Sequence, residues 1–173
     1  IRDRYNLGRY DIGIELRVVI TKMNYLRLPK LPDFIYRNLP FVEFISLMGL
    51  EYTGYTIKNR EAVWIDPMDY QAELTQAVLE LRDWRMDVSI FNLPRCILPE
   101  ALWPFARKSI SDWKTQYLDI CRKCVEQAEC CGLFATSRVQ SRGIKVIKNE
   151  LNKDCTKSML SLIHISEPTR HSL

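Results

Sequence analysis

Histidine is nearly absent from this sequence. The chain has two histidines, His164 and His171, and both lie within its last ten residues. Residues 1–163 therefore contain no Ser-His or Cys-His nucleophile pair and no histidine that could ligate a metal ion. Two phosphate-binding motifs are missing as well, because the sequence has neither G-x-x-x-x-G-K-[ST] nor G-x-G-x-x-G. These absences argue against histidine-dependent hydrolases and against P-loop and dinucleotide-binding enzymes.

Long apolar and long basic segments are also lacking. The longest apolar run, Phe41 to Leu50, is interrupted by Glu43 and is too short to span a bilayer. The first residues, IRDR, do not form a signal peptide, and the absence of an initiator Met fits a chain cut out of a longer one. The net charge of +4 is spread along the sequence in short basic stretches. We therefore expect a cytoplasmic protein with no membrane span and no nucleic-acid surface.

What remains is the composition of an ordinary globular chain, with 47% hydrophobic and 27% charged residues among 173. Residue patterns predict strands at 12–20, 41–48 and 86–91, and helices at 33–38 and 66–85, with a loop at 49–59. Asp66 and Pro67 are a typical helix cap and first residue. Aromatic residues such as Trp64 are interpreted as core. Because each crossover is long enough for parallel pairing, the fold class is predicted to be α/β with a parallel sheet.

Cysteine placement is the strongest chemical signal. Cys121, Cys124 and Cys130 form C-x2-C-x5-C, and Cys96 lies 25 residues before the first of them. Four thiolates in this layout can close the shell of one metal ion or one iron–sulfur cluster. The surrounding segment, 96–146, looks loop-rich, so ligation would supply much of the energy that orders it.

Other interpretations of the cysteines stay open. Buried free thiols are common in protein cores, and on spacing alone Cys96 is as easily a core thiol as a ligand. Cys131 and Cys155 are interpreted as spectators.

Five stretches resemble one protein family. They are LMGLEYTGY (47–55), WIDPMDYQAEL (64–74), SIFNLPRC (89–96), LPEALWPFARKSISDWK (98–114) and CRKCVEQAECCGLFATS (121–137). Together they closely resemble the radical SAM maturase of the His-Xaa-Ser system, C-type component, over roughly residues 4–146. The resemblance implies a partial (β/α)6 barrel, of which the three predicted strands would be the fourth to sixth. It also implies a [4Fe–4S] cluster that cleaves S-adenosylmethionine. The resulting 5′-deoxyadenosyl radical would act on a ribosomally made peptide with His-Xaa-Ser repeats, possibly alongside a partner maturase.

The same resemblance implies roles for particular residues. Arg17 on the fourth strand, Gly49 and Leu50 after the fifth, and Asn92 after the sixth would contact S-adenosylmethionine. The alternatives are a surface arginine at a strand end and an ordinary turn glycine. The thiolates of Cys96, Cys121, Cys124 and Cys130 would hold an auxiliary [4Fe–4S] cluster. A structural Zn²⁺ with four thiolates, in a module without catalysis, has the same local pattern.

The chain departs from the family in two respects. The C-x3-C-x2-C motif of the catalytic cluster and the first three strands are absent, so the chain alone is expected to be inactive and to expose sheet edges. The family pattern Cys-Gly-Gly is replaced by Cys130-Cys131-Gly132, so Cys131 could compete with Cys130 as the ligand.

Three regions are therefore expected. Residues 1–95 would form the C-terminal half of the barrel, residues 96–146 the cysteine-rich auxiliary segment, and residues 147–173 a tail. The family resemblance stops near Asn149, and SLIHISEPTR (161–170) resembles a translated sequencing adapter more than protein. The alternative is a natural disordered terminus. A truncated reading frame that never folds is the remaining hypothesis for the whole chain.

Overall fold

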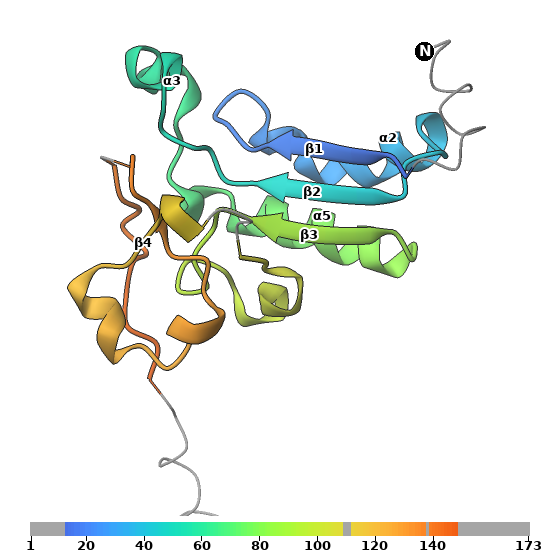
Figure 1. Cartoon of the computed structure of the whole chain (residues 1–173). Coiled ribbons are helices and arrows are strands. Elements are labelled where there is room, and N and C mark those ends of the chain that lie inside the picture. Colours follow the sequence, from blue (N-terminus) through green and yellow to red (C-terminus); the bar gives the residue numbers. More distant parts are fainter. Residues whose placement is uncertain (1–12, 109–111, 138, 149–173) are drawn as a thin grey trace, which may run out of the picture.

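The computed structural model describes residues 13–108, 112–137 and 139–148. Figure 1 shows two parts: a small parallel sheet with helices, followed by a loop-rich segment packed beside one end of that sheet. The predicted tail after residue 148 and Cys155 lie outside the described residues. The predicted α/β class with a parallel sheet is confirmed.

The sheet contains β1 (Glu15–Val19), β2 (Phe44–Met48) and β3 (Asp87–Phe91) in the order β1-β2-β3, all parallel. Each strand begins later than its pattern predicted. Rows of apolar side chains cross the sheet in register, as in the row Val18, Leu47 and Ile90. Because alternate residues point to opposite faces, these rows give the sheet one strongly apolar face.

Both long helices cover that apolar face. They are α2 (Leu31–Asn38) and α5 (Gln71–Asp83), and Figure 1 shows them behind the sheet. The 3₁₀ helix η2 (Tyr25–Lys30) leads directly into α2 and packs against α5. The stripe of α5 at helical spacing is buried: Leu74, Ala77, Val78 and Leu81. The core of the molecule lies between this stripe and the strands.

The connection between β2 and α5 differs in part from the prediction. The expected loop at 49–59 contains a short helix, α3 (Tyr55–Lys58), and α4 (Arg60–Val63) follows it. Gly54, with φ +53°, sets the turn that starts α3. Asp66 is a cap, as predicted, but of a 3₁₀ turn and not of the long helix: its Oδ1 accepts a hydrogen bond from Met68 N at 2.9 Å, whereas α5 begins at Gln71 without a side-chain cap. A 3₁₀ turn, η3 (Pro67–Asp69), precedes α5.

Short elements make up the C-terminal segment. They are the 3₁₀ helices η4 (Glu100–Phe105), η5 (Asp112–Lys114), η6 (Asp119–Lys123) and η7 (Gln127–Glu129), and the antiparallel strands β4 (Thr115–Gln116) and β5 (Leu133–Phe134). So little regular structure leaves the segment dependent on specific cross-contacts.

Asp66 supplies the strongest of these contacts. Its carboxylate also accepts hydrogen bonds from Ser141 Oγ (2.6 Å) and Arg142 N (3.0 Å). These bonds fasten residues 139–148 to the start of α5. The end of residues 139–148 also contacts the cysteine loop, because Val125 N donates a hydrogen bond to Ile147 O at 3.1 Å. Within the described ranges, no helix has the length and apolar character needed to cross a membrane.

Candidate metal centre and ligand pocket

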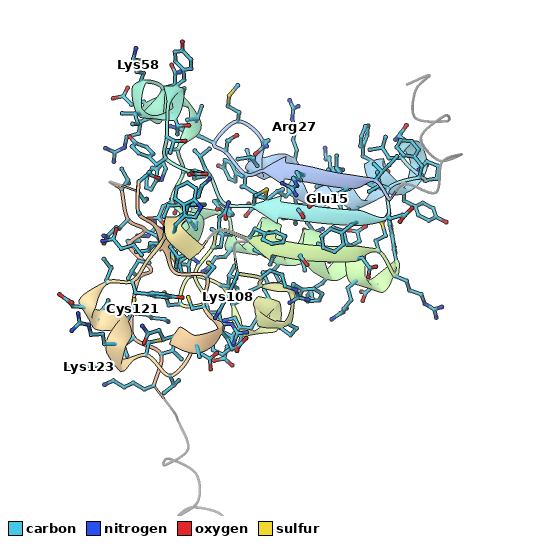
Figure 2. The ribbon with its side chains drawn as sticks, viewed as in Figure 1. Glu15, Arg27, Lys58, Lys108, Cys121 and Lys123 are labelled. Carbon is cyan, nitrogen blue, oxygen red and sulfur yellow. The ribbon has the colours of Figure 1, made fainter. Side chains whose placement is uncertain are left out.

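The four predicted thiolate ligands line one cavity. Cys96, Cys121, Cys124 and Cys130 all border a cavity of about 20 Å³ in the C-terminal segment, and each is half-buried. Figure 2 shows Cys121 in this segment, far from Glu15 on the sheet. Residues separated by up to 34 positions in the sequence are thus brought together (130 − 96 = 34).

Tight turns explain how the loop presents these thiols. Cys121 lies in η6, and the backbone N–H of Cys124 donates to Cys121 O at 3.0 Å. The next reversal, η7, ends at Cys130, whose N–H donates to Gln127 O at 3.2 Å. Each reversal directs a cysteine back toward the same cavity. Short 3₁₀ turns suit this task because they reverse the chain within three residues.

Backbone amides surround two of the sulfurs. Gly132 N–H donates to Cys130 Sγ at 3.5 Å, and the Arg95 N–H donates to the same sulfur. Lys145 N–H donates to the sulfur of Cys96. Such N–H···S bonds stabilise thiolates and are typical of iron–sulfur and zinc sites.

The cysteines perturb one another's acidity. The hydrogen bond from Cys131 is the main reason that the pKa of Cys130 falls to about 6; burial opposes it, and the amides of Gly132 and Arg95 assist it. The pKa of Cys96 is raised, first by burial and then by the neighbouring thiols Cys130, Cys121 and Cys124. The like charges of Cys130, Cys121 and Cys124 thus disfavour the thiolate form of Cys96.

The thiols share a cavity without forming a closed coordination shell. Across the described ranges, no three His, Cys, Asp or Glu side chains stand in an arrangement that could hold a metal ion as they are placed. Ligation would therefore require side-chain rotation toward a common centre. The donor set itself fits soft thiophilic groups such as Zn²⁺ or a [4Fe–4S] cluster, and does not fit Mg²⁺ or Ca²⁺.

Cys131 lies beside Cys130 but lines a different space. It borders a different small cavity, together with Asn92 and Phe134, and its Sγ donates to Gly132 O at 3.4 Å. Its pKa is raised, first by the hydrogen bond to Cys130 and then by burial. Of the two adjacent cysteines, Cys130 is therefore the one that faces the other three thiols.

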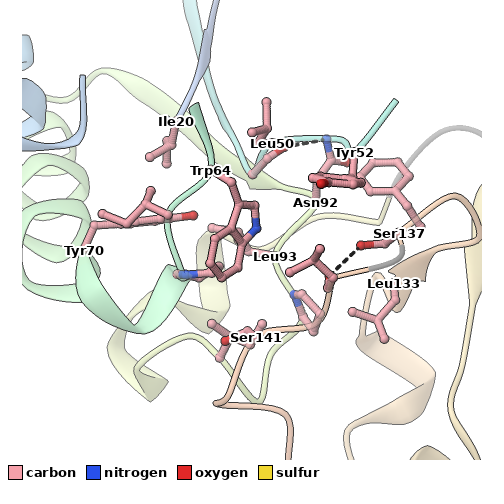
Figure 3. Close-up of a pocket in the computed structure, with 17 residues that line it drawn as sticks. Ile20, Leu50, Tyr52, Trp64, Tyr70, Asn92, Leu93, Leu133, Ser137 and Ser141 are labelled. Carbon is pink, nitrogen blue, oxygen red and sulfur yellow. Dashed lines mark hydrogen bonds between the residues drawn. The ribbon is translucent and has the colours of Figure 1, made fainter. Parts of the chain in front are cut away.

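A second cavity lies at the carboxyl ends of the strands. It has a volume of about 60 Å³ and brings together the predicted residues Gly49, Leu50 and Asn92. Figure 3 shows Leu50 and Asn92 in the upper part of the view, with Trp64 below Leu50 and Tyr70 to the left. Ligands of parallel α/β folds usually bind at this edge of the sheet.

Close packing explains why position 49 is glycine. A Cβ there would lie 2.7 Å from both Asn92 O and Leu93 Cδ2. Asn92 itself adopts a positive φ of 64°, and its Nδ2 donates to Gly49 O at 3.3 Å. The ends of β2 and β3 thus meet through backbone, and this approach forms the rim of the cavity.

Arg17 lies apart from the other three predicted cofactor residues. It does not border the cavity; its side chain is 59% exposed and pairs with Glu15 at 2.8 Å. Ser46 Oγ donates to the same glutamate. Arg17 shares its register row with Ser46 and Ser89, on the sheet face opposite the helices. The predicted contact between Arg17 and a cofactor therefore has no counterpart in this cavity.

Sequence reasoning missed several residues at both cavities. Trp64 was interpreted as core, yet it borders the strand-end cavity with Tyr52. Arg95 and Glu126 border the four-thiol cavity and pair with each other. The adjacency of Arg95 to Cys96 was a signal for the arginine, whereas no sequence pattern links it to Glu126.

The two cavities share a wall. Pro94 and Leu133 border both of them, so the thiol cavity lies next to the strand-end cavity. No known protein family, curated protein or solved structure matches this chain. The functional argument therefore depends on the geometry of the two cavities and on the sequence resemblance.

Proposed function

We propose that this chain is the C-terminal part of a radical SAM enzyme that modifies a ribosomally made peptide of the His-Xaa-Ser type. In this proposal residues 13–95 contribute three strands of a (β/α)6 barrel, and residues 96–148 contribute an auxiliary [4Fe–4S] site. The observation that carries the proposal is that Cys96, Cys121, Cys124 and Cys130 border one cavity next to the strand ends.

The strand-end cavity suits part of S-adenosylmethionine. Tyr52 and Trp64 offer aromatic surfaces, while Asn92 and Ser137 offer polar groups beside them. Such a combination suits a planar base attached to a sugar. A cofactor-sized ligand needs roughly 300 Å³ or more, so the described residues would supply one wall of its site. Barrel strands supplied by the parent protein would supply the rest.

The open side of the sheet supports the half-barrel part of the proposal. Among the described residues β1 pairs with β2 alone, so its other edge has no strand beside it. An unpaired parallel edge strand is normally covered or extended. Further strands beside β1 would continue the sheet toward a barrel.

At the thiol cavity, this chain's own residues would hold the cluster and shield it from water. When bound, the cluster would supply a one-electron carrier close to the strand-end ligand. The N–H groups of Gly132, Arg95 and Lys145 would then donate to the ligating sulfurs. Because Pro94 and Leu133 border both cavities, the cluster and the strand-end ligand would be neighbours.

A zinc-binding module is the second candidate, and the size of the cavity favours it. A volume of about 20 Å³ is close to the space of a single water-sized sphere. One ion fits such a volume, whereas a four-iron cluster needs a larger one. The module would then be structural, without a catalytic role.

Resequencing the locus across both ends of the reading frame tests the catalytic proposal. We expect an in-frame upstream extension that carries C-x3-C-x2-C and three further strand–helix units. A genuine start codon close to residue 1, with no such motif, would contradict the proposal and leave the zinc module as the better account.

A further inference from the structure

Arg95 is a largely buried cation held on three sides. Its side chain is only 17% exposed. One terminal nitrogen, Nη1, pairs with Glu126, and the other lies 4.0 Å from Glu129. The guanidinium carbon lies 5.8 Å from the centre of the Trp103 ring, and Trp103 Nε1 donates to Arg95 O at 3.1 Å. These contacts fix the position of the guanidinium.

One donor of this fixed group has no acceptor. Arg95 Nε is fully buried, and within the described ranges it makes no hydrogen bond. Buried unsatisfied donors are rare in proteins, and they often mark an ion or a redox group that completes the site. The surroundings of Arg95 indicate which group would do so.

Arg95 borders the same cavity as the four thiols. Its backbone N–H already donates to the sulfur of Cys130. Four thiolates around one divalent ion leave two negative charges uncompensated, and thiolate sulfur accepts N–H hydrogen bonds. A buried guanidinium with a free N–H at this cavity matches both needs.

We propose that Arg95 is the positioning residue of the thiolate centre. When the four cysteines close around a metal, Arg95 Nε–H donates to a ligating sulfur and its charge offsets part of the negative charge of the centre. Glu126 holds Nη1, at the far end of the guanidinium, and so limits the positions that Nε can take at this cavity. This inference rests on the proposed thiolate centre, but it holds for Zn²⁺ and for an iron–sulfur cluster alike.

Cobalt titration of the full chain under anaerobic conditions tests the proposal. Co²⁺ bound by four thiolates gives strong visible absorption that reports affinity directly. We expect Arg95→Gln to weaken Co²⁺ binding about 10- to 100-fold. Arg95→Lys, which keeps the charge and loses the Nε donor, should give an intermediate loss. Arg107→Gln and Arg107→Lys are the matched controls, because Arg107 is exposed, donates to Pro104 O and Ala106 O, and does not border the thiol cavity.

A measurement on the unmutated chain covers the case in which the variants fail to fold. In isotopically labelled protein loaded with NMR-active cadmium, the Arg95 Nε–H proton should show scalar coupling to the metal through the N–H···S bond. An Nε–H resonance unchanged by cadmium would overturn the proposal.

The outcomes separate this inference from the proposed centre. If the wild-type chain takes up neither Co²⁺ nor iron with sulfide, the centre and the inference both fail. If the centre forms and the Arg95 variants bind Co²⁺ as tightly as the Arg107 controls, the inference alone is wrong. Equal binding by Arg95→Lys and wild type would eliminate the Nε hydrogen bond and leave only the effect of charge.

Discussion

At the scale of single residues, adjacent cysteines have different surroundings. Cys130 borders the cavity shared by the other three thiols, and Cys131 borders a separate one with Asn92. Gly132, with φ +68°, follows this pair. In this arrangement Cys130, and not Cys131, lines the cavity with the other three thiols.

This difference predicts the outcome of two alanine substitutions. Cys124→Ala should abolish nearly all metal binding, because three thiolates leave the shell open. Cys131→Ala should retain the metal, with at most a modest loss from the hydrogen bond that it makes to Cys130. Metal content and thiolate-to-metal absorption after anaerobic reconstitution provide the measurement. Equal losses in the two variants would show that the four-ligand set is wrong.

A separate prediction at the scale of single residues concerns Gly49. Gly49→Ala would place a methyl group 2.7 Å from Asn92 O, and relief requires the ends of β2 and β3 to separate. We expect a loss of about 1–3 kcal/mol in the free energy of unfolding, measured by urea denaturation. Gly13→Ala is the control, because its Cβ would meet only the flexible Glu43 side chain at 3.1 Å. Equal stability of the two variants would contradict the close approach.

At the scale of elements, Asp66 joins the sheet part to the cysteine segment. The same carboxylate caps η3 and accepts hydrogen bonds from Ser141 and Arg142. Asp66→Ala should lower the free energy of unfolding by about 1–3 kcal/mol, because a cap and two further bonds are lost. Asp69→Ala is the matched control, since Asp69 contacts the same arginine but is 47% exposed, and exposed pairs contribute little. Urea denaturation of both variants measures whether Asp66→Ala loses more free energy of unfolding than Asp69→Ala.

The pH dependence of stability should follow from the same carboxylate. Burial, the largest single effect, raises the pKa of Asp66. The hydrogen bonds from Ser141, Arg142 and Met68 and the nearby Arg142 charge together outweigh it, so the net shift is downward. A folded pKa below the unfolded value means that the stabilisation is complete above the unfolded pKa, near the usual 3.9 or so. It is lost as pH falls through the folded pKa. Wild type should therefore lose more stability than Asp66→Asn on acidification to about pH 3, and parallel curves would contradict this.

The elements that the sequence predicted well are those with a clear period. The stripe of α5 and the apolar runs of β2 and β3 depend on local spacing, which a sequence displays directly. The short helices α3 and α4 have no such stripe and were missed within a predicted loop. The strands were predicted to begin too early because flanking apolar residues, such as Phe41 and Val42, resemble strand residues but precede β2.

Some residues of the candidate site could likewise be predicted from local spacing, and others could not. The C-x2-C-x5-C spacing was visible locally, and the structure brings Cys96 to the same cavity. Arg17 was selected for its strand, but its side chain pairs with Glu15, which in turn accepts a hydrogen bond from Ser46 on the neighbouring strand, and that cross-strand contact is not visible in the spacing. The Asp66–Ser141 and Arg95–Glu126 contacts join residues 75 and 31 positions apart. Such pairings depend on the tertiary fold and could not be read from a single sequence.

At the scale of the whole molecule, the two parts are stabilised differently. The sheet part has a continuous apolar core between the strands and α5. The cysteine segment relies on short turns and on the contacts of Asp66 and Arg95, so metal ligation would contribute much of its order. Local stability should therefore depend on metal in one part and not in the other.

Hydrogen exchange of loaded and metal-free protein tests this division. Amides of residues 119–134 should lose protection when a chelator removes the metal, while those of β2 and α5 should keep theirs. Cys121→Ala treated in the same way is the control, because it should exchange like the metal-free protein in both conditions. Uniform loss of protection across both parts would show that the chain unfolds as a single unit.

The most direct test of the central claim is the metal and sulfide content of the chain after anaerobic reconstitution with iron, sulfide and zinc all present. The proposed auxiliary cluster predicts about four iron atoms and four acid-labile sulfides per chain, and their loss in Cys124→Ala. One zinc per chain without sulfide would contradict the cluster and identify the four-thiol cavity as a structural zinc site.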